Sequence, residues 1–488
     1  MRVPVLAITA MLLVSELHAA AQSQADLSLQ EGIQALQKQI SEMKTMIEDM
    51  KTEIVRARTE AQELRTALQS SRENVSPQTV EQVQKLQEDQ ELLNAKIDEQ
   101  YQTKVESASK YRVRLSGTVL MNAFATRGAV NNIDFPSYAP PGVISYSEGS
   151  IGGSLRQSLL GLEVFGPEVK GAHTTADLQF DFAGGFPNLP DGVVLGLARL
   201  RTATLRLDWP KTSVIAGQDA PFFSPLSPSS VATVALPAFS YSGNLWTWIP
   251  QIRFEHRLDV SEGSNVLLQG GVTDPLTGEL PPLQDDRTPQ AGEASRQPGY
   301  GTRVAWSHHM FDRQFTLGGG GYYSRQNWGF YRDVDAWAAT SDWTLPLSNR
   351  WDFSGEFYRG RAIGGLGGAL GRSVVFSGPA SSYYTHVKGL NATGGWAQLK
   401  FRQTERLEWN AAFGQDSTRA KDLRLYPLFR QTYFDPSIAR NRASLVNFIY
   451  RPRSDLLLSL EYHRFKTSTI QGASATADQM NLSMGVLF

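Results

Sequence analysis

The sequence of 488 residues contains no cysteine, which excludes disulfides, thiolate nucleophiles and cysteine metal sites. It also lacks an excess of charge of either sign: the net charge is −1, so nothing points to a nucleic-acid partner. After the first residues there is no run of about 18 apolar residues, which excludes a later transmembrane helix. Glycine (42 residues) and aromatic residues (10 %) are abundant instead, and this balance is typical of antiparallel β proteins with many turns.

Residues 1–21 have the three parts of a secretory signal peptide. Arg2 supplies the basic start, residues 3–14 form a short apolar core, and small residues at 19–21 precede a cleavage site near Gln22. The alternative is a buried N-terminal helix, but the length and flanks of the segment favour export. We therefore expect a protein that leaves the cytoplasm.

Residues 22–75 are expected to form a periplasmic α-helical coiled coil. Apolar residues recur at alternating spacings of four and three, with position a taken by Ile33, Ile40, Ile47 and Ile54. Glu53 and Glu60 lie at position g and Arg58 and Arg65 at position e, so opposite charges meet between parallel copies. The segment should assemble copies of the chain, although the heptads leave dimer and trimer open. The alternative is a solvated single helix.

A second helix or linker is expected over residues 76–110. Ser76 can cap a helix whose first position is Pro77, and the helix should run from about residue 80 to about residue 105. The predicted organisation is thus a signal peptide (1–21), a coiled coil (22–75), this linker (76–110) and a β-barrel (111–488).

From residue 111 onwards apolar and polar residues alternate with the period of a β-strand. The last nine residues show the pattern, with one apolar side formed by Met480, Leu482, Met484, Val486 and Phe488. On many other strands the opposite side carries charges. Such charges would be destabilising in the core of a β-sandwich but are expected where the interior is water. The fold class is therefore an all-β transmembrane barrel, closed by pairing of the last strand with residues 112–121.

Short turns and long loops alternate along the barrel. The short turns lie near 166–171, 209–212, 259–265, 310–313, 345–350, 403–406 and 451–454, and the long loops near 127–155, 183–191, 219–250, 274–298, 326–332, 361–391, 416–439 and 466–477. This order predicts about 16 antiparallel strands, with short turns in the periplasm and long loops outside. The alternation is blurred over 193–209, so the lipid-facing side stays unassigned there. A barrel of about sixteen strands is wide enough for an aqueous channel.

The loop at 219–250 has one charge and many prolines and aromatic residues. A long exposed loop this apolar would be unusual in water, so we expect it to fold inward and narrow the channel; the alternative is packing against a neighbouring subunit. Its polar contributors are Asp219, Ser224 and Ser227. The facing wall offers charges of both signs, from Arg114, Glu163, Asp177, Asp181, Arg253, Glu255, Arg257, Arg303, Glu356 and Glu461. These charges predict no preference for anions or cations.

The order of segments and four local motifs resemble the DcaP-type trimeric porins of bacterial outer membranes. The motifs are RLRTA (199–203), VIAGQ (214–218), GNL (243–245) and PQIR (250–253). The resemblance implies a homotrimer, sixteen strands, an inward third loop and uptake of small organic anions, with Arg201 and Arg253 as basic wall residues. The loop of this chain departs from the family pattern because it is aromatic and lacks basic residues.

We therefore expect a porin in the outer membrane, a passive diffusion channel for small hydrophilic solutes, with its coiled coil in the periplasm. Its pore-lining or constriction candidates are Arg201, Asp219, Arg253, Glu255, Arg303, Glu356 and Glu461. The expected partners are further copies of the chain, outer-membrane lipid, the barrel-assembly machinery and small solutes, with no cofactor, metal or nucleic acid.

Two rival functions remain. The first is a structural tether between the outer membrane and the cell wall, because a helix over 27–70 would be roughly 65 Å long; no peptidoglycan-binding module accompanies it. The second is an enzyme built on His308, His309 or His463, but no nucleophile elbow, zinc motif or phosphate loop accompanies these histidines. We expect no enzyme activity.

Overall fold

The computed structural model describes residues 104–105, 112–142, 148–186, 196–279, 287–427 and 435–488. The chain divides into two units, Met1–Asn94 and Ala95–Phe488, and all described residues belong to the second. The predicted signal peptide, the coiled coil and most of the linker lie outside the described residues. No helix within the described ranges is long and apolar enough to cross a membrane.

One sequence expectation about the linker is wrong. Lys104–Val105, at the predicted end of the second helix, form a short strand, β1, that pairs with Val113 and Arg114 of β2. The reason is an open edge. The last strand of the barrel pairs with β2 only from Thr118 onwards, so the start of β2 exposes backbone groups that β1 can satisfy.

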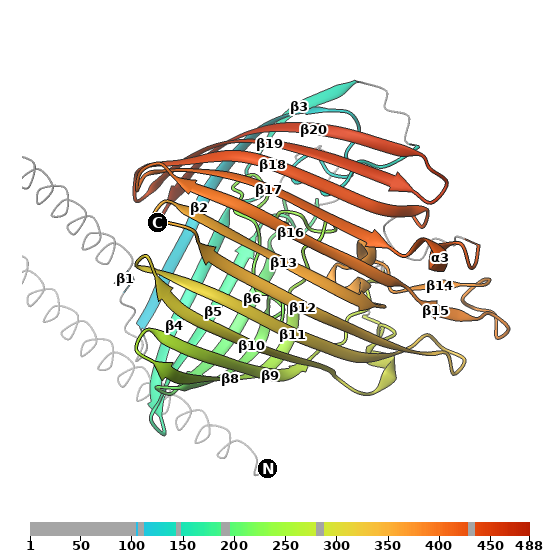
Figure 1. The fold of residues 1–488 in the computed structure, drawn as a ribbon, viewed down its shortest axis with the longest axis horizontal. Helices are drawn as coiled ribbons and strands as arrows, with labels where there is room; N and C mark the ends of the chain where they lie inside the picture. The colour runs from blue at the N-terminus through green and yellow to red at the C-terminus, as the bar shows by residue number, and fades with distance from the viewer. Residues whose placement is uncertain (1–103, 106–111, 143–147, 187–195, 280–286, 428–434) are drawn as a thin grey trace, which may run out of the picture. The chain divides into compact units, whose positions relative to one another are not determined.

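Antiparallel strands make up most of the described chain (Figure 1). The barrel strands are β2 (Arg112–Arg127), β3 (Gly149–Ser154), β4 (Leu159–Val169), β5 (Ala172–Asp181), β6 (Arg199–Asp208), β7 (Thr212–Asp219), β8 (Ile249–Ser261), β9 (Ser264–Thr273), β10 (Gly299–Met310), β11 (Arg313–Asn327), β12 (Asp333–Pro346), β13 (Trp351–Arg361), β16 (Asn391–Arg402), β17 (Leu407–Thr418), β18 (Ile438–Arg453), β19 (Leu456–Thr469) and β20 (Ser474–Leu487). The loops add the hairpin β14 (Val374–Phe376) and β15 (Val387–Gly389), the helix α3 (Ala420–Leu423) and three short 3-10 turns at Glu293–Ser295, Gly364–Leu366 and Ala369–Gly371.

The strands close into a barrel of sixteen spans. The sheet contains eighteen strands, but β3 and β4 pair with successive halves of β2 and form one span, and β1 is a two-residue addition to the edge of β2. Each strand pairs with the next, and β20 pairs with β2 to complete the ring. The predicted strand number and closure by the last strand are confirmed. The predicted register is wrong, because β20 pairs with Thr118–Arg127 rather than with residues 112–121.

Alternation of side chains separates the two faces of the wall. On β20, Met484 is 55 % exposed and Ser483 is 1 % exposed; on β8, Ile252 is 55 % exposed and Gln251 is 4 % exposed. The exposed positions carry large apolar side chains on strand after strand. An apolar surface of this extent matches lipid rather than water.

Short turns gather at one end of the barrel and long connections at the other (Figure 1). The C-terminus lies at the end with the short turns. One predicted loop differs: the connection near 466–477 consists only of residues 470–473, because β19 and β20 continue with the same alternation beyond the apolar band. Their inner side chains there, Thr467 and Ala477, are buried against the loops inside the barrel.

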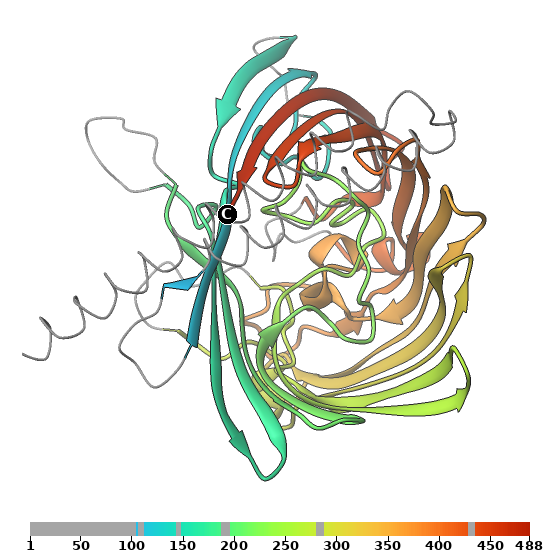
Figure 2. The same ribbon diagram turned by 90° about the vertical axis from the view of Figure 1, so that its left-hand side faces the viewer.

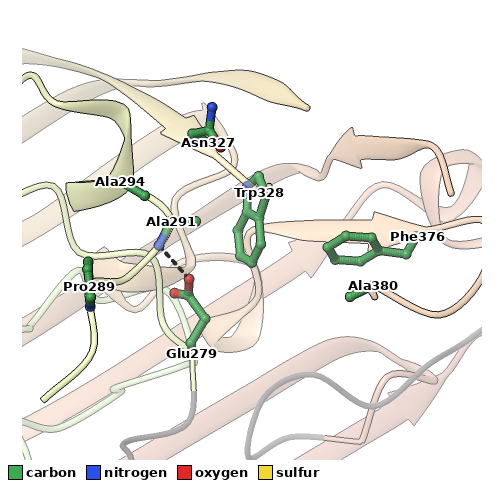
Figure 3. A pocket seen from close by; sticks show the side chains of 8 residues that line it. All are labelled: Glu279, Pro289, Ala291, Ala294, Asn327, Trp328, Phe376 and Ala380. Carbon is green, nitrogen blue, oxygen red and sulfur yellow. Dashed lines mark hydrogen bonds between the residues drawn. The ribbon is translucent and has the colours of Figure 1, made fainter. Parts of the chain in front are cut away.

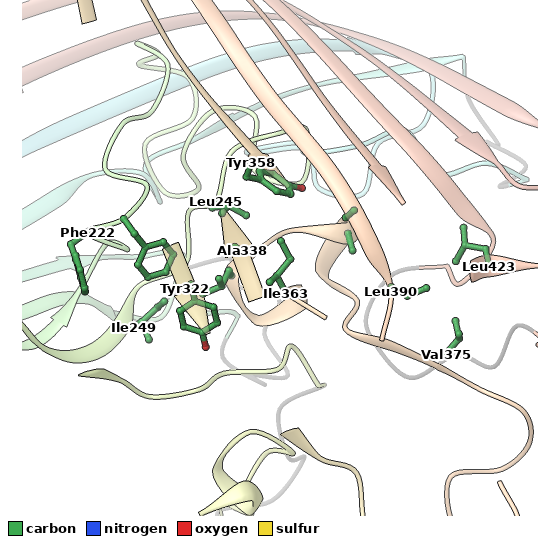
Figure 4. Close-up of a cluster of buried hydrophobic side chains, with 14 residues drawn as sticks. Phe222, Leu245, Ile249, Tyr322, Ala338, Tyr358, Ile363, Val375, Leu390 and Leu423 are labelled. Carbon is green, nitrogen blue, oxygen red and sulfur yellow. The ribbon is translucent and has the colours of Figure 1, made fainter. Parts of the chain in front are cut away.

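The barrel interior contains an apolar core, which corrects the expectation of a water-filled interior. Residues 220–248 and the start of the connection between β13 and β16 fold into the lumen (Figure 2). Phe222, Phe223 and Leu245 of the first segment and Ile363 and Leu366 of the second form one cluster (Figure 4). The cluster rests on inward side chains of β11, β12 and β13. This second inward segment was not predicted, because glycines interrupt its apolar residues.

Candidate constriction inside the barrel

The loop 220–248 lies within the lumen and contacts the wall over many strands, as the sequence predicted. Its first turn places Phe222 and Phe223 against β10 and β11. The wall has glycine at these contacts: a Cβ on Gly301 would lie 2.6 Å from the Phe222 ring, and one on Gly320 would lie 2.9 Å from the Phe223 carbonyl oxygen. Missing side chains on the inner wall thus provide the space in which the loop packs.

Two buried carboxylates bind the loop at separate points. Glu356 of β13 accepts hydrogen bonds from Ser224 Oγ at 2.7 Å and from the Leu226 N–H at 2.6 Å. Glu461 of β19 accepts one from Ser230 Oγ at 3.0 Å. The two glutamates are 4 % and 1 % exposed. They therefore lie beneath the loop and position it, and neither faces open lumen.

Amide side chains complete the attachment. Gln398 of β16 accepts from the Ser229 N–H at 2.7 Å, and Asn447 of β18 donates to the Ser229 carbonyl at 2.9 Å. Gln157, between β3 and β4, donates to the Ala232 carbonyl at 2.7 Å and accepts from the Val234 N–H at 2.7 Å. Backbone groups of a loop enclosed in a barrel need such partners, because an unpaired buried N–H or carbonyl is costly.

The far end of the loop approaches the wall at Gly243. This glycine has a φ of +107°, and a Cβ there would lie 2.2 Å from the carbonyl oxygen of Gly395 on β16. On the neighbouring strand, a Cβ on Gly414 would lie 2.4 Å from the Ser242 carbonyl oxygen. Only glycine allows this close backbone contact between loop and wall.

The second inward segment is also fixed from within. Arg372, just before β14, donates to the carbonyls of Pro436 and Ile438, to the Ala369 carbonyl at 3.2 Å and to Thr418 Oγ1 at 3.2 Å. Burial lowers the pKa of the Arg372 guanidinium to about 10, an effect opposed by the nearby carboxylates. This pKa keeps the side chain charged at neutral pH. A charged, fully bonded arginine holds the segment in place.

A row of alternating charges crosses the inner wall from β7 to β12. Arg253 donates to Asp219 and to Glu255, both at 2.8 Å. Gln269 donates to Glu255 at 2.9 Å and accepts from Arg303 at 2.9 Å. Arg303 ends the row with two hydrogen bonds to Asp342, at 2.9 and 2.6 Å. Glycines at 271 and 318 leave room for the Arg253 and Asp342 side chains.

The two halves of the inner wall differ in exposure. On β13, β16, β18 and β19 the inner polar side chains beneath the loop are buried. On β4–β9 several inner positions stay half-exposed, namely Glu163, Asp177, Arg206, Glu255 and Gln269. The open, charged surface of the lumen therefore lies on the β4–β9 side.

A cavity of about 330 Å³ separates the loop from β6. Its lining combines one cation, Arg201, with the hydroxyls of Ser224, Ser227, Ser230 and Thr233 and the indoles of Trp246 and Trp248. The guanidinium of Arg201 lies 4.9 Å from the Trp248 ring and 3.9 Å from the nearest Asp181 oxygen. Its buried Nε and Nη1 have no hydrogen-bond partner among the described residues.

A β-bulge directs Arg201 inward. The register between β5 and β6 skips this residue: Gln179 pairs with Thr202 and Phe180 with Leu200. The bulge shifts the alternation by one residue, which explains why the sequence pattern was blurred over 193–209. Gln218 of β7 donates to the Arg201 carbonyl at 2.7 Å, so the bulge is supported from the outer face.

The structure divides the predicted site residues into three groups. Asp219, Arg253, Glu255 and Arg303 lie together in the charge row. Arg201 lies apart from them, at the cavity behind the loop. Glu356 and Glu461 hold the loop. Sequence reasoning did not single out Asp342, Gln398 or Asn447, for which the inward position on a strand was a signal. It also missed Gln157, which lies between β3 and β4.

Two of the histidines considered for catalysis, His308 and His463, pack against aromatic rings. His308 stacks on Trp306 on the outer face, and His463 is buried between Phe239 and Phe465. Near His463 the serine hydroxyl of Ser230 contacts Glu461 and not the imidazole. In nucleophilic catalysis the histidine must contact the hydroxyl. His463 does not contact Ser230, so this arrangement does not activate the serine.

A closed sixteen-stranded barrel with an inward loop and short turns at one end defines the class: the chain has the fold of an outer-membrane porin. Among solved structures it is similar to the outer membrane channel DcaP of Acinetobacter baumannii, with a TM-score of 0.59, 15 % identity, and coverage of 78 % of this chain and 99 % of that chain. The resemblance to DcaP-type porins that the sequence indicated is therefore confirmed for the fold.

Other porins match less well. OmpF of Salmonella typhi gives a TM-score of 0.46 at 10 % identity, covering 77 % of this chain and 98 % of that one. An anion-selective porin from Comamonas acidovorans gives 0.44 at 11 % identity, covering 78 % and 100 %. No protein-family model matches the sequence. No curated protein matches it either.

Proposed function

We propose that this protein is an outer-membrane channel through which small hydrophilic solutes diffuse passively. The observation that carries the proposal is the inward loop: about thirty residues are held inside a sixteen-stranded barrel by buried anchors, and a half-exposed charged wall is left on β4–β9. A loop fixed across a wide barrel narrows the passage without blocking it. The protein acts as a channel and has no catalytic role.

The finer parts of the proposal concern assembly and solute. The chain forms a homotrimer, with barrel walls in contact and residues 22–75 as a periplasmic coiled coil. Its solutes include small organic anions, for which Arg201 provides the attraction. The support for this role is that, within the described part of the chain, Arg201 is the only basic residue lining the cavity behind the loop and has one ion-pair partner, Asp181 at 3.9 Å.

Conductance of the purified full-length protein in planar lipid bilayers tests the channel. We expect stepwise openings that occur in groups of three. If protein that has inserted gives no conductance at high concentration, the proposed channel function is wrong, and a structural tether becomes the better explanation. Single, ungrouped steps would contradict the proposed trimer but not the proposed channel function.

The anion role is tested by Arg201→Gln in a salt gradient. Removing this cation should shift the reversal potential towards cation permeation. Arg206→Gln is the matched control, because Arg206 lies on the same strand and inner face but is already paired with Asp208 at 2.9 and 3.1 Å. Equal shifts for the two variants would show that Arg201 has no special part in selectivity.

A further inference from the structure

Four basic residues lie close together on the outer face of two neighbouring strands: Arg440 and Arg442 of β18, and Arg464 and Lys466 of β19. We call them the basic outer patch. The residues between them, such as Asn441 and Phe465, are at most 1 % exposed and point into the barrel. Because neighbouring side chains of a strand point to opposite faces, the four basic side chains point outward.

The patch has too few carboxylates to balance it. Arg442 and Lys466 are direct cross-strand partners, an arrangement of like charges that is destabilising by itself. Asp478 of β20 lies 3.7 Å from Arg464 and is also the cross-strand partner of Arg127. Among the described residues no carboxylate pairs with Arg440, Arg442 or Lys466. The surface therefore carries unbalanced positive charge.

The patch lies directly above the apolar band of the barrel. Val446, Tyr462 and Met480 are cross-strand neighbours on β18, β19 and β20, and they are 53 %, 37 % and 46 % exposed. Two residues further along β19 comes Arg464, and four further comes Lys466. At about 3.4 Å per residue along the strands, Arg442, Arg464 and Lys466 lie roughly 7–14 Å beyond this apolar row, and Arg440, six residues from Val446, lies roughly 20 Å beyond it. The tilt of the strands reduces each height by roughly a quarter. These heights reach the lipid headgroups.

The opposite wall carries no such charges. Where β8, β9 and β10 run beside one another towards the long loops, their outward positions are Ile252, Val272 and Tyr300. All three are exposed and apolar or aromatic. The basic outer patch is thus not repeated on β8, β9 and β10.

We propose that the basic outer patch binds the phosphorylated headgroup of an anionic lipid in the outer leaflet of the outer membrane. Guanidinium groups bind phosphate oxygens in a bidentate manner, and such clusters beside an apolar surface recognise anionic lipids. The acyl chains would lie on the apolar band below. The inference rests on the orientation given by the proposed function, in which the long loops face outward.

The test compares binding of diphosphorylated lipid A with binding of the same lipid after removal of both phosphates. Native mass spectrometry of the full-length protein in detergent counts bound lipid at each concentration. The test variant replaces Arg440, Arg442, Arg464 and Lys466 by glutamine. The matched control variant makes the same change at four exposed basic residues in or beside the short turns at the other end: Arg350, Arg406, Arg451 and Arg453.

Each basic residue near a membrane surface contributes a factor of about five to binding of anionic lipid. We therefore expect the dissociation constant for lipid A to rise about twentyfold or more in the test variant and to change little in the control. Equal weakening in the two variants, or equal binding of the dephosphorylated lipid, would overturn the proposal. So would displacement of lipid A by inorganic phosphate at equal concentration, because free phosphate has no acyl chains.

Conductance of both variants provides a separate check. Their outward residues take no part in the lumen, so both should conduct like the wild type. A variant that conducts normally but no longer binds lipid A confirms the patch. A wild type that binds lipid A but does not conduct would contradict the proposed function and leave the patch standing.

Discussion

Replacing Gly243 by alanine should lift the loop 220–248 away from the barrel wall. The glycine has a φ of +107°, and the new methyl group would lie 2.2 Å from the Gly395 carbonyl oxygen and 2.6 Å from the Gly395 carbon and nitrogen. All three atoms belong to the backbone of β16, which is paired with strands on both sides. The wall cannot retreat, so the loop must move.

The size of the effect follows from two costs. A non-glycine residue in a sparsely populated backbone conformation costs about 1–3 kcal/mol, and overpacking costs about 1–3 kcal/mol more. Restoring an ordinary contact distance requires a shift of more than about 1 Å, which is enough to break hydrogen bonds that depend on a narrow range of distances. The nearest of these is the bond from Asn441 Nδ2 to Ser242 Oγ, at 2.7 Å.

Single-channel recording in planar bilayers measures the result. We expect Gly243→Ala to raise the mean conductance or to add rapid fluctuations of the open current. Gly270→Ala is the matched control, because a Cβ at Gly270 on β9 would meet no atom within 4 Å. If Gly243→Ala gives the same current as Gly270→Ala and the wild type, the loop does not form the constriction as we describe it.

Two further predictions concern stability and assembly. Glu356→Ala removes the acceptor of two hydrogen bonds from the loop and leaves their donors buried without a partner, at a cost of about 1–3 kcal/mol each. The variant should therefore unfold at lower denaturant concentration in lipid vesicles; Glu405→Ala, at an exposed turn, should not. Deleting Phe488 removes its two backbone hydrogen bonds with Gly117. The deletion should reduce the folding yield, measured by heat-modifiable gel mobility, more than it reduces the conductance of the molecules that do fold. Normal insertion of the truncated chain would contradict this prediction.

Much of the barrel could be predicted from the sequence because lipid and a wet interior impose a period of two. That period identified the outward side chains of β20, β8 and β19, and the alternation of turns and loops predicted sixteen strands. The inward course of residues 220–248 was also predictable, because so apolar a loop has no stable place in water. These features follow from local composition.

The interior could not be predicted, because it depends on contacts between segments far apart in the sequence. Nothing local to Glu356 or Glu461 distinguishes an anchor beneath a loop from a solvated wall residue. The inward direction of Arg201 depends on a bulge in its pairing with β5, which alternation alone does not reveal. The glycines at 301, 320 and 395 are the one signal that was available, since each removes a side chain where a loop must fit.

The most direct test of the account replaces residues 220–248 with a short turn and compares its single-channel conductance with that of the wild type. We expect a folded barrel that opens in the same groups but passes a clearly larger current, because the obstruction has been removed while the charged wall of β4–β9 stays in place. An unchanged current from a correctly folded variant would show that the loop does not limit the passage, and it would contradict the central claim.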